Sequence, residues 1–173
     1  MIPAGYIKNK SFPDDRGYFK ELVNTTDPRF RAEFFVQQNI SVNKKNVFRG
    51  MHYQYNNPQG KLVSVLKGAV IDFIIDLRIW SPNCGKVQQF FLREGDDMAV
   101  WVPQCFAHGF VSLEEDTIFT YSVFDNRRVE GDEISIDPYS LTELSNKLKE
   151  FPDIVISEKD RKGLHFDAAP KYE

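Results

Sequence analysis

The chain has 173 residues, a length that suits one domain with a single hydrophobic core. Its 22 lysines and arginines and its 25 aspartates and glutamates give a formal net charge of −3 and are interspersed along the sequence. The composition therefore argues against nucleic acid or a membrane surface as the main partner, because either would require a basic face. We predict that residues 1–173 form one domain.

Neither the start of the chain nor its cysteines indicate secretion. Residues 1–5 lack a charged stretch followed by an apolar run, and no segment approaches the ~20 apolar residues of a membrane helix. Cys84 and Cys105 have neither the spacing of a zinc knuckle nor that of a disulfide framework. We expect a soluble, cytoplasmic protein.

Two strands are predicted in the first 42 residues. Residues 18–23 alternate between polar and apolar after a turn at residues 13–17, and residues 34–42 form a second strand. A short helical turn is expected between the two strands, because Asp27 precedes a proline as a helix cap would.

Four polar side chains near these strands have two interpretations each. Arg16 and Glu21 flank the first strand, either as a surface ion pair of small energetic value or as part of a binding site. Gln37 and Asn39 share one face of the second strand, because strand side chains repeat every two residues. These two amides either bind a ligand or face solvent.

Residues 47–55 are predicted to form a strand that carries a histidine. On strict alternation, Arg49 and Met51 fall on one face of this strand, and His52 and Gln54 fall on the other. From the residues alone, His52 is either a core histidine bonded to a backbone carbonyl or a proton-transfer group with an ordinary pKa of about 6.5.

Two apolar strands follow, at residues 62–66 and 69–77. The Lys67-Gly68 pair between them predicts a hairpin. The second strand is rich in valine, isoleucine and phenylalanine, which indicates burial on both faces.

Two carboxylates, Asp72 and Asp76, interrupt this apolar strand. A buried carboxylate requires a partner. We expect Arg78 to pair with Asp76 in a structural role.

The remaining strands are predicted at residues 86–92, 98–102 and 116–124, and the last contains Tyr121. His108 is expected to lie among small and aromatic residues between two of these strands. Short strands separated by turns every ~8–12 residues are typical of an all-β barrel or sandwich of the jelly-roll kind.

Helical periodicity is found only near the C-terminus. An amphipathic helix is predicted over residues 140–148, with Ser140 and Glu143 at the spacing of a capping box. Residues 154–163 are charged after a short apolar run, and taken alone they predict a solvated end.

Five segments, taken together and in this order, resemble the dTDP-4-dehydrorhamnose 3,5-epimerase family. Each is weak alone, but they extend from residue 15 to residue 160 at intervals similar to those of the family. They are DRGYFKE at 15–21, RGMHYQ at 49–54, GKLV at 60–63, PQCFAHGF at 103–110 and SEKD at 157–160.

The resemblance implies an all-β, cupin-like jelly-roll barrel with a short C-terminal helical segment, in a protein that is usually a homodimer. It implies an isomerase that epimerises a nucleotide-linked 4-keto-6-deoxyhexose for surface-polysaccharide (lipopolysaccharide O-antigen) biosynthesis, with no metal and no other cofactor. Gln54 supports metal-free chemistry independently, because metal-binding cupins carry a second imidazole at that spacing and an amide is a poor ligand for a transition metal.

The resemblance also implies four catalytic residues. His52 removes the proton next to the ketone, and Asp160 holds the His52 ring. Lys61 stabilises the enolate oxygen, as a cation placed in a dry pocket can. Tyr121 returns a proton from the opposite face of the sugar, although simple packing of this tyrosine is the other interpretation.

Eight further residues fall where the family binds its nucleotide-diphospho-sugar. Arginine suits a diphosphate because guanidinium binds phosphate oxygens in a bidentate manner. His108 either contacts the ligand or supports residues that do. The set is Arg16, Glu21, Gln37, Asn39, Arg49, Gln54, His108 and Lys159.

The sequence departs from the family pattern after Tyr121. The aromatic pair that stacks on thymine is replaced by residues 125–128, where only the guanidinium of Arg127 offers a plane, and a different base such as cytosine is compatible with this change. The segment before Pro138 is also altered, so the ligand carboxylate of the family falls on either Glu130 or Asp132.

Three alternative functions follow. One is a single-site epimerase, acting at C3 or C5 only, on a CDP-linked sugar. Another is a 3,4-ketoisomerase, although that class usually has histidines where Tyr53 and Gln54 stand. The third is a non-catalytic sugar-nucleotide-binding cupin, which would not require a base, a cation and an acid together.

Overall fold

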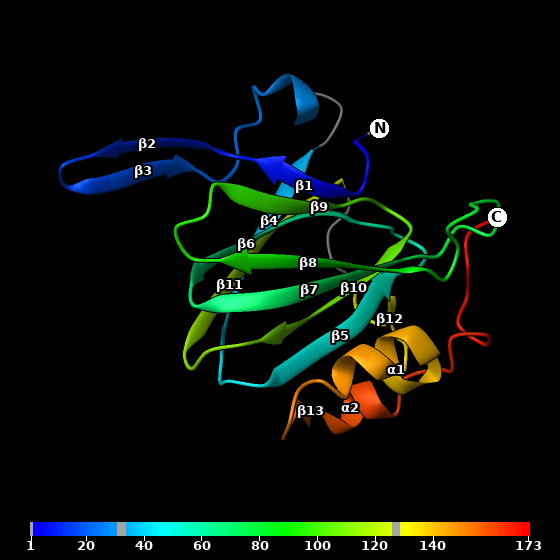
Figure 1. Ribbon diagram of the computed structural model, residues 1–173. Coiled ribbons are helices and arrows are strands. Elements are labelled where there is room, and N and C mark those ends of the chain that lie inside the picture. The colour runs from blue at the N-terminus through cyan, green and yellow to red at the C-terminus, as the bar shows by residue number, and fades with distance from the viewer. Residues whose placement is uncertain (1, 31–33, 126–128) are drawn as a thin grey trace.

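The protein was examined as a computed structural model, which describes residues 2–30, 34–125 and 129–173. Two antiparallel sheets pack face to face as a sandwich (Figure 1). The first sheet has five strands in the order β1-β9-β6-β11-β4. Their bounds are Gly5–Lys8 (β1), Met98–Val102 (β9), Gly60–Lys67 (β6), Thr117–Phe124 (β11) and Phe35–Asn43 (β4).

The second sheet follows the order β12-β5-β10-β7-β8, and β13 adds to β5 in parallel. The bounds are Glu133–Ser135 (β12), Val47–Gln54 (β5), Phe106–Ser112 (β10), Ala69–Asp76 (β7), Val87–Arg93 (β8) and Val155–Ile156 (β13). The all-β prediction is confirmed, and the predicted strands agree with the observed ones to within about two residues at each end.

Strand β7 shows why its sequence is apolar on both faces. Val70 and Ile74 pack between the two sheets, with residues of β6, β9 and β11. Phe73 and Ile75 point the other way and pack in a second cluster that contains Leu144 of helix α1 (Thr142–Leu148). Helix α1 therefore covers part of the outer face of the second sheet, beside β5 in Figure 1.

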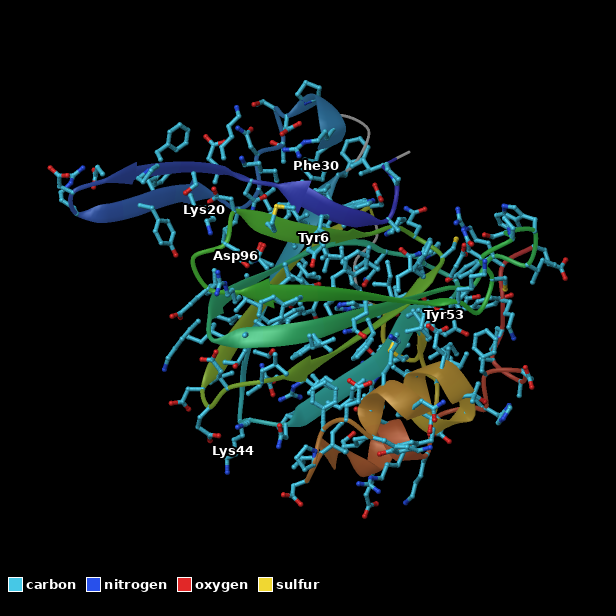
Figure 2. The ribbon with its side chains drawn as sticks, viewed as in Figure 1. Tyr6, Lys20, Phe30, Lys44, Tyr53 and Asp96 are labelled. Atoms are coloured by element: carbon cyan, nitrogen blue, oxygen red, sulfur yellow. The ribbon has the colours of Figure 1, made fainter. Side chains whose placement is uncertain are left out.

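The N-terminal hairpin stands apart from the sandwich. Strands β2 (Lys10–Asp14) and β3 (Gly17–Glu21) pair only with each other and project from one end of the molecule (Figure 1). Near the base of the hairpin, the Nζ of Lys20 donates a hydrogen bond to the carbonyl oxygen of Asp96 at 2.5 Å (Figure 2). The short helical turn after the hairpin is the 3-10 turn η1 (Pro28–Phe30), whose Phe30 stacks on Phe124 and packs at a tilt against Trp101.

The predicted hairpin at Lys67 and Gly68 is wrong. Strand β6 belongs to the first sheet and β7 to the second, so the chain crosses between sheets at this point. Gly68 has a φ of +76° and lies so close to Thr117 that a Cβ would come within 2.5 Å of its Oγ1. A glycine with positive φ is suited both to a hairpin turn and to a sharp turn between two sheets, so its presence does not distinguish them.

The expectation that His108 lies between two strands is also wrong, because Phe106–Ser112 is itself the buried strand β10. Its small residues, Ala107 and Gly109, have low strand propensity, which hides the strand in the sequence. They are needed for close packing, since a Cβ on Gly109 would lie 2.7 Å from the carbonyl oxygen of Arg49.

The predicted capping box at Ser140 is wrong. Ser140 ends a 3-10 turn, η2 (Pro138–Ser140), and its hydroxyl donates to the carbonyl oxygen of Asp137 and accepts from the amide of Phe166. Helix α1 has no side-chain cap, and Glu143 instead accepts a hydrogen bond from the amide of Val87. Both side chains that the local pattern assigns to a cap instead form hydrogen bonds with residues outside helix α1.

The solvated C-terminal end is a further prediction that the structure overturns. Residues 155–156 form β13 against β5, and helix α2 (Glu158–Arg161) follows, capped by the Ser157 hydroxyl, which accepts from the amide of Asp160 at 3.1 Å. Asp160 is 3% exposed. Within the part of the chain that the structure describes, no helix is long and apolar enough to cross a membrane.

Candidate active site

Strand β5 carries the two most polar side chains of its motif, Arg49 and His52, into one cavity. Strict alternation predicts opposite faces for them, and the register explains the difference: His52 lies opposite His108 of β10, whereas Arg49 lies opposite Phe110. Three steps along β5 thus match two steps along β10, which is a β-bulge and reverses the alternation. The predicted separation of Arg49 and His52 is therefore wrong.

The bulge depends on two facing glycines. Gly50 has a φ of +135°, and a Cβ on it would lie 2.5 Å from the Cα of Gly109. Only a residue without a side chain permits this φ and this approach. Met51, the next residue, is fully buried in the hydrophobic cluster that contains Leu144 of α1.

The cavity has a volume of about 670 Å³ and lies between the two sheets. His52 and His108 come from the second sheet, and Lys61 and Tyr121 come from β6 and β11 of the first. Helix α2 contributes Lys159 and Asp160 at one side. The lining polar residues are Asn39, Ser41, Arg49, His52, Lys61, His108, Tyr121, Glu133, Ser157, Lys159 and Asp160.

His52 and Asp160 form a hydrogen-bonded pair although 108 residues separate them in the chain. The distance from Nε2 of His52 to Oδ1 of Asp160 is 2.7 Å. Burial raises the pKa of Asp160, but the bond and charge of His52 and the bonds from Ser157 and Gly50 together leave it below its ordinary value. An ionised Asp160 accepts a hydrogen bond from Nε2–H, so the Nδ1 of a neutral His52 keeps its lone pair for proton abstraction.

A second histidine–carboxylate pair lies beside the first. Nε2 of His108 is 2.6 Å from Oδ2 of Asp72, which is on β7 and fully buried. Burial raises the pKa of Asp72, and the nearby His108 and Lys61 only partly oppose that shift. Sequence reasoning identified Asp72 as a buried carboxylate that needs a partner, but it did not connect Asp72 with the site.

Lys61 and Tyr121 lie on the wall that belongs to the first sheet. Lys61 is opposite Val123 in the β6–β11 register, two residues from Tyr121 along β11. The Lys61 Nζ is 6.0 Å from the centroid of the Tyr121 ring. A cation and a phenol therefore stand across the cavity from the two histidines.

Comparison with known proteins decides the family. The sequence profile described as dTDP-4-dehydrorhamnose 3,5-epimerase matches residues 4–168. A protein of that name from Methanothermobacter thermautotrophicus is 33% identical over 170 residues, which are 96% of this chain and 91% of the relative. The chain belongs to the dTDP-4-dehydrorhamnose 3,5-epimerase family.

Solved structures agree with this assignment. The dTDP-4-dehydrorhamnose 3,5-epimerase of Sulfolobus tokodaii is 34% identical, with a TM-score of 0.84 and coverage of 97% of this chain and 93% of that one. The dTDP-6-deoxy-D-glucose-3,5-epimerase of Legionella pneumophila, solved in complex with dTDP-4-keto-L-rhamnose, is 32% identical, with a TM-score of 0.82 and the same two coverages. The predicted cupin-like fold is confirmed, and the protein is an isomerase of the epimerase class.

Two polar contacts position side chains that line the cavity of this epimerase. Nε of Arg49 donates to Oδ1 of Asn43 at 2.7 Å. Lys159 forms an ion pair with Glu133 of β12. Sequence reasoning missed Glu133, since a glutamate beside an exposed turn gives no signal that its strand borders a cavity.

Four predicted binding residues are not among the cavity-lining residues of this epimerase. Arg16 is at the end of the projecting hairpin, where its 89% exposed side chain binds Asp14 rather than Glu21. Glu21 accepts from Asn24, and Gln37 reaches the cavity only through Asn39, to which it donates at 2.7 Å. Gln54 is buried beside β12 and does not line the cavity.

The region where the sequence departs from the family is only partly described. Arg127, the candidate for base stacking, lies outside the described residues. Of the two carboxylates that follow, Glu130 is exposed, and Asp132 is buried and accepts hydrogen bonds from the amides of Asn56 and Asn57. In the described part of the chain, no group of three or more histidine, cysteine, aspartate or glutamate side chains is arranged to hold a metal ion.

Proposed function

We propose that this epimerase inverts carbon atoms adjacent to the ketone of a dTDP-linked 4-keto-6-deoxyhexose, in a pathway of surface-polysaccharide biosynthesis. The observation that carries the proposal is the placement of the His52–Asp160 pair on one wall of a cavity whose other wall carries Lys61 and Tyr121. Inversion requires a base and an acid on opposite faces of the sugar, and two facing sheets supply that arrangement.

The proton moves in two steps. Nδ1 of His52 takes the proton from the carbon next to the ketone, and the electron pair of the C–H bond becomes the enolate, with its charge on the ketone oxygen. Lys61 stabilises that oxygen, an effect that amounts to ~2.7–4 kcal/mol for single oxyanion donors in other enzymes. The hydroxyl of Tyr121 then delivers a proton to the opposite face of the carbon, and exchange with water resets both groups.

The cations at the rim suit the diphosphate. Arg49 and Lys159 line the cavity near its edge, and guanidinium and ammonium groups are the usual partners of phosphate oxygens. Lys159 would leave Glu133 when phosphate binds, because a dianionic diphosphate competes with a single carboxylate. The Legionella relative, in complex with dTDP-4-keto-L-rhamnose, supports a dTDP sugar as the ligand.

Arg16 and Glu21 could bind substrate only in a homodimer, where they would reach the cavity of the second copy. Both lie on the projecting hairpin, whose Phe12, Tyr18 and Phe19 are more than half exposed. Exposed aromatic residues on an isolated hairpin favour packing against another protein surface. In a dimer, such a hairpin would bring Arg16 to the cavity of the second copy. Cytoplasmic location is part of the same proposal.

The test is incubation of the enzyme with dTDP- and CDP-4-keto-6-deoxyglucose in deuterated water, followed by NMR. Deuterium at C3 and C5 of the dTDP sugar, with inversion, is the expected result. Label at one carbon only would instead identify a single-site epimerase, and a preference for the CDP sugar would overturn the choice of nucleotide. Absence of label with either nucleotide would leave only a binding protein.

A matched pair of variants connects the activity to the site. His52→Ala is expected to abolish exchange, whereas His165→Ala, which removes an exposed histidine outside the cavity, is expected to keep the wild-type rate. Full turnover by His52→Ala would contradict the assignment of the base.

A further inference from the structure

Asp72 is a fully buried carboxylate that the mechanism above does not use. It points between the two sheets from β7, on the same side as Val70 and Ile74. Its Oδ2 is 2.6 Å from Nε2 of His108, and its Oδ1 has no hydrogen-bond partner among the described residues. An ionised carboxylate in an apolar setting is unfavourable unless a positive charge or a shared proton compensates it.

His108 is fixed between this carboxylate and the cavity. Its ring stacks on Phe119, with centroids 6.0 Å apart and planes 22° apart. Since Nε2 is engaged by Asp72, Nδ1 is the ring nitrogen that remains available to the cavity, which His108 lines beside its register partner His52. The position of Nδ1 is thus set by the carboxylate behind it.

The two histidine–carboxylate pairs differ in their hydrogen bonds. Both carboxylates are buried, and burial raises the pKa of each, but bonds from His52, Ser157 and Gly50 leave the pKa of Asp160 below its ordinary value. Asp72 is bonded to His108 through Oδ2 while its Oδ1 has no partner among the described residues, and its pKa stays raised. Two titratable pairs whose environments separate their pKa values are typical of sites that use one group as a base and the other as an acid or donor.

We propose that Asp72 is a positioning residue, which keeps one more proton on the His108–Asp72 pair than is present on the His52–Asp160 pair. Nδ1 of His108 therefore donates a hydrogen bond, whereas Nδ1 of His52 accepts a proton. The extra proton lies between Asp72 and Nε2, and in either location it leaves Nδ1 protonated. The donor is directed at the oxygen that becomes negative in the reaction, beside Lys61. This inference rests on the proposed epimerase function.

The charged and titratable groups that share the cavity with His108, or lie behind it, come from six elements and bear on its protonation. Cations disfavour a protonated imidazole, and Asp72 is the carboxylate in direct contact that favours it. The groups are Asp72 of β7, His52 and Arg49 of β5, Lys61 of β6, Tyr121 of β11, Glu133 of β12, and Lys159 and Asp160 of α2.

The direct test is NMR of imidazole nitrogens in the substrate-free, isotope-labelled wild-type protein at pH 7. The expected spectrum shows a proton on Nδ1 of His108 and none on Nδ1 of His52. An unprotonated Nδ1 on His108 would overturn the proposal. This measurement requires no variant, and a failure of the wild type to epimerise any sugar would sink the proposed function without altering the spectrum.

The variant Asp72→Leu separates positioning from a purely structural role. Removing one partner of a buried pair is destabilising, because Nε2 of buried His108 loses its acceptor, so Tm is expected to fall, as it is for the control variant below. We expect kcat to fall by about 10²-fold with KM little changed, because the lost donor acts on the developing charge. We also expect kcat to decline as pH rises through about 6.5, the ordinary pKa of histidine, where the wild type shows no decline.

Asp76→Leu is the matched control, because Asp76 is the other buried carboxylate of β7 and pairs with Arg78 outside the cavity. It is expected to lower Tm while leaving the His108 spectrum and the kcat of the folded protein unchanged. Equal losses of kcat in the two variants, with no change in pH profile, would show that Asp72 acts only through stability.

Discussion

At the scale of single residues, Tyr121 and His52 line one cavity from different sheets, so their roles can be separated by substitution. Tyr121→Phe removes the proposed acid and keeps the ring. Because His52 can still remove a proton and return one to the same face, we expect deuterium exchange with retention of configuration. Inversion is expected to fall by ~10²–10⁴-fold, the usual contribution of a general acid. NMR of the product in deuterated water measures both quantities.

The control for this substitution is Tyr139→Phe, which removes a half-exposed hydroxyl outside the cavity. It should invert the sugar at the wild-type rate. Inversion by Tyr121→Phe at that same rate would assign the acid to another group.

The lowered pKa of Asp160 predicts how the free energy of unfolding depends on pH. Its pKa in the folded protein is below the unfolded value of about 3.9, so its contribution is present above pH 3.9 and is lost as pH falls through the folded pKa. At pH 7 we expect Asp160→Asn to lower the free energy of unfolding by about 1.5–3 kcal/mol, as for hydrogen bonds to charged groups. Urea unfolding should show this difference shrink below about pH 4. A difference that keeps its pH 7 size as pH falls from 4 to 2 would contradict the prediction.

At the scale of elements, the sequence predicts most strands but not the features that depend on contacts between them. The apolar run of β7 identifies a strand buried on both faces, because its residues face α1 on one side and β6 on the other. The bulge in β5 is not predictable from alternation, since it follows from the contact between Gly50 and Gly109 of a neighbouring strand. That contact is what places Arg49 and His52 together.

The site residues likewise divide into those that the sequence indicates and those that depend on contacts between distant elements. From the residues alone His52 has two interpretations, and the resemblance supplies its catalytic role together with those of Lys61 and Asp160. The pairing of Asp160 with His52 requires the C-terminal segment to return along β5. Asp72 gives only the general signal of a charge in an apolar strand, because its partner, His108, is 36 residues away. Arg16 lies outside the cavity of its own chain in a surface ion pair, which was one of its two interpretations, but its partner is Asp14 rather than Glu21.

Gly50→Ala tests the bulge. The new Cβ would require a φ of +135°, which only glycine adopts readily, and would clash with the backbone of Gly109. Gly95→Ala is the control, because Gly95 has a φ of +78° and no atom within 4 Å of a built Cβ. We expect the free energy of unfolding to fall by at least ~2 kcal/mol more for Gly50→Ala than for Gly95→Ala. Equal losses in denaturant unfolding would show that the contact is not tight.

At the scale of the whole molecule, the β2–β3 hairpin is notable because it belongs to neither sheet of the sandwich. Lys20 binds the carbonyl oxygen of Asp96 near the base of the hairpin (Figure 2), whereas Arg16, in the turn at the tip, pairs with Asp14 of the same hairpin. A hairpin with exposed aromatic residues costs conformational entropy that local contacts alone do not offset, since an isolated hairpin is marginal in water. The proposed homodimer, in which each hairpin would complete the cavity of the other copy, would account for both the exposure of the hairpin and the position of Arg16 outside the lining of its own cavity.

Mixed dimers test this arrangement. Arg16→Ala and His52→Ala are each expected to be inactive or nearly so. In a dimer of one copy of each, the cavity that retains His52 receives the hairpin that retains Arg16, so one of its two sites is intact. Random reassembly makes about half of the dimers mixed, and about a quarter of all sites should therefore be active. Sedimentation confirms the dimer, and recovery of epimerisation on mixing measures the sites. A monomer in sedimentation, or a mixture no more active than its two components, would show that Arg16 does not act across an interface.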